Sequence, residues 1–95
     1  MMEKKYYVYI LANKSNMVLY IGVTNDLTQR ITHKKKGFVA NFVNQFDINR
    51  LIYAEKFDKK KYALQRANEI CGWSRAKKDW LISEVNPCFN EIEPF

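Results

Sequence analysis

Two stretches near the start of the chain are dense in apolar and aromatic residues, and a polar segment separates them. Residues 6–11 and 18–23 are rich in Tyr, Val and Ile, which are residue types that favour strands. Residues 13–16, with the sequence Asn-Lys-Ser-Asn, have the composition of a turn. This pattern predicts an antiparallel hairpin.

A third strand is predicted at residues 50–57, where the residues alternate well enough for each to be assigned to one face of the strand. One face of this strand is expected to carry Leu51, Tyr53 and Glu55. The other face is expected to carry Ile52, Ala54 and Lys56.

A helix is predicted directly after the third strand. Residues 59–71 carry an apolar stripe that fits one buried helical face, formed by Ala63, Leu64, Ala67, Ile70 and Cys71. Asp58 is the predicted N-cap of this helix, and Gly72 is its predicted end.

A last helix is predicted from the Ser74 N-cap through Val85. Trp80 and Leu81 are expected to face inward, and Pro87 is expected to enforce the stop.

Another helix is predicted directly after the hairpin. Thr24 or Asn25 can cap it, and it ends at Gly37. One face of this helix carries Leu27, Ile31 and Lys34, and residues 38–46 predict a short helix or a loop with aromatic anchors.

The order of these elements predicts an α+β fold with a small three-stranded antiparallel sheet flanked by helices. With 95 residues and neither a linker nor a repeat, the chain is expected to form a single domain over residues 1–95.

The formal net charge of +6 changes the functional picture, because it favours a polyanionic partner. Nucleic acid is the default partner of that kind, although a solubilising surface charge is nearly as good an explanation of the charge alone. The sequence has no apolar run of membrane-spanning length and no signal peptide, so we expect no membrane partner and a cytoplasmic location. Cys71 and Cys88 lack metal-ligand spacing, and each is expected to be a buried free thiol.

Tyrosines and one glycine stand at fixed places in the hairpin. The first strand contains Tyr7-Val8-Tyr9, the second contains Tyr20-Ile21-Gly22, and Arg30 follows on the predicted helix. This pattern resembles the GIY-YIG nuclease family, with Tyr7 in place of the first glycine. The segment Gly72-Trp73-Ser74-Arg75-Ala76-Lys77-Lys78 is similar to a signature of the short, stand-alone branch of that family.

The resemblance implies an endonuclease that hydrolyses phosphodiesters with Mg²⁺ or Mn²⁺, on DNA more than RNA, with DNA repair as one setting. It implies that Tyr9 helps to deprotonate or position the attacking water, and that Tyr20 orients this water or the phosphate. Arg30 would stabilise the developing charge. The family histidine falls at Lys34, so His33, one position away, is the fourth catalytic candidate.

One departure leaves an alternative open. The metal-holding glutamate of the family falls at position 67, where this chain has Ala67. Glu69 lies two residues further on, roughly 200° around a helix, so it cannot take the same place. No other cluster has metal-site spacing, and no metal ligand is assigned. The alternative is therefore a catalytically impaired, nucleic-acid-binding relative.

Several cations are candidate phosphate contacts. The expected nucleic-acid-binding residues are Lys34, Lys35, Arg75, Lys77 and Lys78. The run Lys59-Lys60-Lys61 opens a helix, where the helix dipole disfavours cations, so helix stability does not explain it. Glu55 is expected to be a solvated strand residue. A small protein-interaction domain with incidental charge is the third function that stays open, and a protein partner cannot be named.

Overall fold

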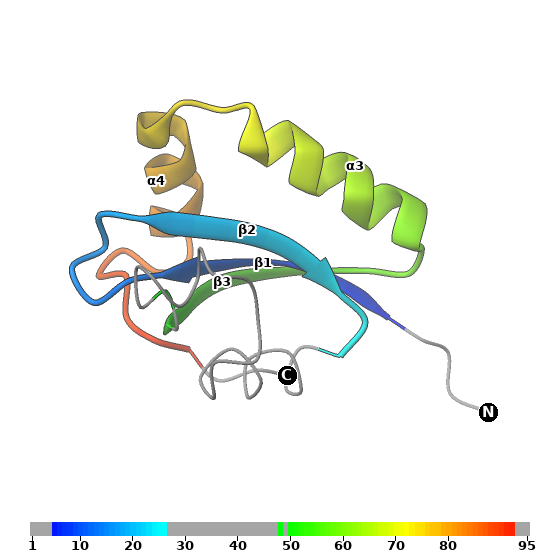
Figure 1. Ribbon diagram of the computed structural model, residues 1–95, viewed down its shortest axis with the longest axis horizontal. Coiled ribbons are helices and arrows are strands. Elements are labelled where there is room, and N and C mark those ends of the chain that lie inside the picture. Colours follow the sequence, from blue (N-terminus) through cyan, green and yellow to red (C-terminus); the bar gives the residue numbers. More distant parts are fainter. Residues whose placement is uncertain (1–4, 27–47, 49, 93–95) are drawn as a thin grey trace.

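Three antiparallel strands form the centre of the fold, in the order β2-β1-β3 (Figure 1). The structure is a computed structural model that describes residues 5–26, 48 and 50–92. Its elements are β1 (Tyr6–Ala12), β2 (Leu19–Thr24), β3 (Arg50–Phe57), α3 (Lys60–Cys71) and α4 (Arg75–Ser83). The α+β class and the three-stranded sheet are confirmed, whereas the helix and loop predicted within residues 27–46 lie outside the described residues.

Alternation along the strands gives the sheet two different faces. The face that we call the helical face is covered by α3 and α4 and includes Val8 and Ile10 of β1 (Figure 1). Its buried core is completed by Ala12, Ile52, Tyr53, Ala63, Ala67, Ile70, Leu81 and Ile82. The opposite face, which we call the tyrosine face, carries a second cluster formed by Tyr9, Leu11, Ile48 and Leu51, with Tyr7 and Tyr20 packed against it.

The predicted alternation of β3 is wrong at its start. Leu51 packs on the tyrosine face, whereas Ile52 and Tyr53 both belong to the helical-face core. The cause is a register shift between β1 and β3 next to Ile10 and Leu11, because a bulge lets consecutive residues share a face. From Tyr53 onward the alternation is regular.

The buried stripe of α3 is narrower than predicted. Ala63, Ala67 and Ile70 are buried, whereas Leu64 is 44% exposed and Cys71 is exposed. The three buried residues follow the i, i+4, i+7 spacing of one helical face, and Leu64 and Cys71 each lie one step, roughly 100°, beyond it. Cys88 is exposed as well, so the expectation of two buried thiols is wrong.

The predicted helix ends are partly correct. The Ser74 side chain caps α4 by accepting from the Lys77 backbone N–H at 3.2 Å. Asp58 is not a cap, because the cap position of α3 is Lys59 and Asp58 instead pairs with Lys5 at 2.5 Å. On α4, Leu81 is buried as predicted, but Trp80 is 55% exposed. The helix ends at Ser83, well before Pro87.

The hairpin turn is held by one side chain. The Asn13 side-chain Oδ1 accepts hydrogen bonds from the backbone N–H groups of Met17 (2.9 Å) and Val18 (3.0 Å). Asn16 takes the left-handed conformation with φ 60°, which asparagine tolerates better than most residues. The predicted turn chemistry is therefore confirmed.

The segment after α4 returns to β3. Asn86 is buried, and its side-chain amide donates to the carbonyl groups of Ile52 (2.9 Å) and Asn90 (2.8 Å). The Ile92 N–H donates to the Leu51 carbonyl at 2.8 Å. Within the part of the chain that the structure describes, no helix is long and apolar enough to cross a membrane.

Candidate functional site

Strand pairing sets the layout of the tyrosine face. Tyr9 on β1 lies between Gly22 of β2 and Ala54 of β3. The next row toward the end of β3 is Thr24, Tyr7 and Lys56, and the row on the other side is Tyr20, Leu11 and Leu51. The two candidate catalytic tyrosines therefore sit on neighbouring rows and adjacent strands of one face.

Gly22 makes room for Tyr9. A Cβ atom at position 22 would lie 2.5 Å from the Tyr9 hydroxyl oxygen and 2.6 Å from its Cζ atom, much closer than real contacts allow. The Tyr9 phenol therefore crosses β2 over the glycine, and its ring lies 6.2 Å from the Tyr20 ring at an interplanar angle of 45°. Tyr9 is only 1% exposed, so Tyr20 is the more accessible of the two phenols.

Four of the predicted site residues fall where the structure gives no description. Arg30, His33, Lys34 and Lys35 lie outside the described residues, so their positions relative to the two tyrosines stay predictions.

Position 67, where the resemblance described above places a metal-holding glutamate, belongs to the helical face. Ala67 is 8% exposed and packs in the core cluster that contains Val8 and Ile10, whereas Tyr9 and Tyr20 pack on the other side of the sheet. A methyl group has no lone pair for a cation, and this one is enclosed by apolar neighbours.

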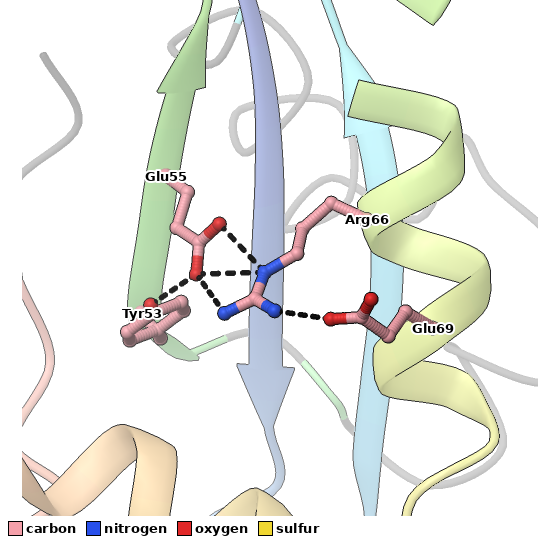
Figure 2. Close-up of polar contacts among 4 residues, drawn as sticks. All are labelled: Tyr53, Glu55, Arg66 and Glu69. Atoms are coloured by element: carbon pink, nitrogen blue, oxygen red, sulfur yellow. Dashed lines mark hydrogen bonds and ion pairs between the residues drawn. The ribbon is translucent and has the colours of Figure 1, made fainter. Parts of the chain in front are cut away.

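A charged cluster also lies on the helical face, and sequence reasoning missed it (Figure 2). Arg66 reaches from α3 to Glu55 on β3, with its Nε 3.0 Å from Oε1 and its Nη2 3.1 Å from Oε2. The Tyr53 hydroxyl donates to Glu55, and Arg66 Nη1 donates to Glu69. Glu55 is therefore not a solvated strand residue, since its side chain is only 20% exposed.

The protonation of this cluster follows from its contacts. Burial, reinforced by the hydrogen bond to Glu55, raises the pKa of Tyr53 well above its usual 10.0. The hydrogen bond to Glu55 likewise raises the pKa of Arg66 above its ordinary value. The Tyr53 phenol is thus neutral and the Arg66 guanidinium is a fixed cation. The strand register places Glu55 opposite Val8, a core residue of the helical face, and the sequence alone carried no signal of this pairing.

The residues that the structure describes do not fit a divalent cation. They contain no group of three or more His, Cys, Asp or Glu side chains placed to hold an ion. The nearest approach to a site is Glu55 with Glu69, and the Arg66 guanidinium already lies between these carboxylates. A cation there would have to displace a bound guanidinium, which is always charged.

The predicted phosphate contacts on α4 differ from one another. The Arg75 guanidinium donates to Asp79 (2.7 Å), to the Met17 carbonyl (2.8 Å) and to the Asn16 carbonyl, so it joins α4 to the hairpin turn. The Lys77 ammonium lies 4.3 Å from the centre of the Trp73 ring, on which Arg66 also packs at 5.2 Å. The Lys78 side chain has no partner among the described residues.

This arrangement defines a class of protein: a small α+β domain in which a β-hairpin presents two tyrosines on one face and a glycine admits the first of them. The sequence pattern of the GIY-YIG catalytic domain matches residues 5–79. The chain belongs to the GIY-YIG family.

Similar proteins come from archaea and bacteria. A UPF0213 protein of Natronomonas pharaonis is 34% identical over 87% of this chain and 96% of its own. Another, from Staphylococcus saprophyticus, is 40% identical over 84% of this chain and 96% of its own. The solution structure of the UPF0213 protein BH0048 of Bacillus halodurans is similar, with 30% identity, a TM-score of 0.59 and 92% of each chain covered.

Membership of the family indicates a nuclease-like function connected with nucleic acid. GIY-YIG nucleases are in general metal-dependent, which makes the carboxylates of this chain decisive for its chemistry.

Proposed function

We propose that this protein is a single-domain, nucleic-acid-binding member of the GIY-YIG family, acting on DNA more than RNA, whose phosphodiester cleavage is weak or absent. The observation that carries the proposal is the buried methyl group of Ala67 at the position of the metal-holding glutamate. Glu55 and Glu69 offer no substitute, because both are bound by Arg66, and the described residues contain no group of three or more His, Cys, Asp or Glu side chains placed to hold an ion.

The binding part of the proposal rests on charge. The chain has 16 Lys and Arg against 10 Asp and Glu, and several of its described lysines are exposed without an acidic partner. Phosphate contacts release counterions, so the affinity for nucleic acid should fall steeply as salt is raised.

One observation favours a second function, an active endonuclease. Tyr9 and Tyr20 share a face, with Gly22 holding the first phenol in place, which is the arrangement that the family motif requires. In this case Tyr20 would orient water or phosphate, and Arg30 and His33 would act with it. The missing carboxylate is the reason that this function ranks second.

A cleavage assay separates the two functions. Purified protein is incubated with Mg²⁺ or Mn²⁺ and with single-stranded, duplex, nicked and branched DNA, and we expect binding with little or no cleavage. Robust cleavage that is abolished by both Tyr20→Phe and Arg30→Ala would establish the endonuclease. Tyr6→Phe is the matched control, since it removes a phenol hydroxyl from a residue that packs against the helical-face core, on the other side of the sheet.

Binding needs its own test. Affinity for the same DNAs is measured over a range of salt concentrations, and a steep loss of affinity with salt is expected. Failure to bind any of them at low salt would favour the protein-interaction function instead.

A further inference from the structure

The start of α3 carries a concentration of positive charge that the fold does not use. Lys56, Lys59, Lys60 and Lys61 are all exposed, and none forms an ion pair with a described residue. The acid between them, Asp58, pairs with Lys5. The first turn of α3 contains no acidic residue, and cations there oppose the helix dipole, so these lysines do not stabilise the helix.

An aromatic side chain lies among these cations. Tyr62 is 52% exposed, and the Lys61 ammonium lies 5.8 Å from the centre of its ring. Lys56, Phe57, Asp58, Lys59 and Tyr62 line an open hollow of about 620 Å³. The ring therefore borders a concave surface that Lys56 and Lys59 also line, and the Lys61 ammonium lies near the ring.

The surface is continuous with the tyrosine face. Lys56 is the partner of Tyr7 in the strand register, and it is in the row next to Tyr9 and Gly22. A strand of nucleic acid in the hollow would thus lie at the edge of the face that carries the family motif.

We propose that the surface formed by Lys56, Lys59, Lys61 and Tyr62 binds an unpaired stretch of nucleic acid, with phosphates against the ammonium groups and one base stacked on the Tyr62 ring. The proposal rests on the proposed nucleic-acid binding and adds that this surface selects unpaired strands over duplex. Lysines alone would suit a duplex equally well, but an exposed ring among them can stack only on a base that is free of its partner strand.

Two strands of equal charge test the role of Tyr62. Wild type and Tyr62→Ala are titrated at low salt with an oligodeoxythymidine strand and with an abasic strand of the same number of phosphates. Tyr62→Ala should weaken binding to the thymidine strand about 5- to 150-fold and leave the abasic strand unchanged. Trp80→Ala is the control, because Trp80 is similarly exposed (55%) but lies on α4, and it should affect neither strand.

A second pair of variants tests the phosphates. Lys59→Gln should lower the steepness of the salt dependence by about 0.7 on a log–log plot for single-stranded DNA. Lys14→Gln removes the same charge from the exposed hairpin turn and should change the slope less. Since Lys59 opposes the helix dipole, its loss should not lower the melting temperature, and weaker binding could not then be attributed to unfolding.

The outcomes are separable. Binding of wild type to both strands with Tyr62→Ala unchanged would overturn the stacking surface alone, as would an equal loss on both strands. An absence of wild-type binding to either strand would overturn the proposed nucleic-acid binding together with this surface. Loss of binding to phosphatidylserine vesicles on Tyr62→Ala, with thymidine binding intact, would instead assign the surface to membranes.

Discussion

Gly22 shows how a motif residue can be fixed by packing alone. The Tyr9 phenol occupies the space that a side chain at position 22 would need. Tyr9 is buried, so neither residue has room to move aside. The glycine of the family motif is therefore explained here by the tyrosine opposite it, independently of any chemistry that the tyrosine performs.

Gly22→Ala should accordingly destabilise the protein by about 1–3 kcal/mol, the usual cost of overpacking a filled site. For a chain of this size, each kcal/mol lowers the melting temperature by about 4–8 °C. Gly72→Ala is the matched control, because a Cβ there would meet its nearest atom at 3.5 Å. Equal melting temperatures for the two variants would show that the Tyr9 contact does not constrain position 22.

Tyr53 should make stability sensitive to alkaline pH. Burial and the hydrogen bond to Glu55 raise its pKa in the folded state above the usual 10.0. The folded state therefore holds this proton more tightly than the unfolded state. The resulting stabilisation is fully present below about pH 10 and is lost as the pH rises from there through the folded-state pKa.

The measurement is chemical unfolding of wild type and Tyr53→Phe between neutral pH and about pH 11. Wild type should lose more stability over the alkaline part of this range than the variant does. Other groups titrate equally in both proteins, so parallel curves would mean that Tyr53 ionises as freely in the folded chain as in the unfolded one.

At the scale of elements, two arginine side chains join separate elements of the fold. Arg66 ties α3 to β3, and Arg75 ties α4 to the turn between β1 and β2. Strand composition, the hairpin turn and the Ser74 cap could be predicted because each depends on neighbours in sequence. The contacts of Arg66 with Glu55 and of Arg75 with the hairpin turn could not be predicted, because they depend on how α3 packs on β3 and on how α4 lies beside the turn, and any exposed carboxylate or carbonyl would have suited these arginines.

The same reasoning explains where helix prediction was wrong. Leu64 and Trp80 are apolar and near the buried stripes, but α3 and α4 each cover the sheet along a narrow line, and both side chains lie beside that line. Likewise, the alternation of β3 depended on a bulge that only the pairing with β1 reveals. For the candidate site, alternation along each strand was predictable, but the shared face of Tyr9 and Tyr20 also depends on the hairpin register, which pairs Tyr9 with Gly22 and Leu11 with Tyr20.

Arg66→Ala should cost about 1.5–3 kcal/mol of unfolding free energy, because it leaves the mostly buried carboxylate of Glu55 without its charged partner. Glu69→Ala removes the other carboxylate that Arg66 contacts, but that side chain is 54% exposed. Such surface pairs contribute about 0–1 kcal/mol, so Glu69→Ala should be nearly neutral. Urea unfolding measures the loss of unfolding free energy in both variants. Equal losses would contradict the greater importance of the pair between Arg66 and Glu55.

At the scale of the whole molecule, the segment after α4 covers β3, an edge strand of the described sheet. Asn86→Ala should remove the amide that bonds the Ile52 carbonyl and cost about 1–3 kcal/mol, the penalty of an unsatisfied buried group. Asn90→Ala is the control, since Asn90 contributes backbone groups to these contacts and its side chain is exposed. Indistinguishable unfolding curves for the Asn86→Ala and Asn90→Ala variants would show that the hydrogen bonds of the Asn86 side chain add nothing to the stability.

The strand order of the sheet has a consequence for folding during synthesis. β1 is synthesised first yet ends up in the middle of the sheet, where Tyr6 must pair with Phe57. Until β3 leaves the ribosome, one side of β1 has no partner, and its aromatic, apolar residues are open to other nascent chains. Truncated products that end before Arg50 should therefore aggregate, so premature termination of synthesis exposes this chain to misassembly.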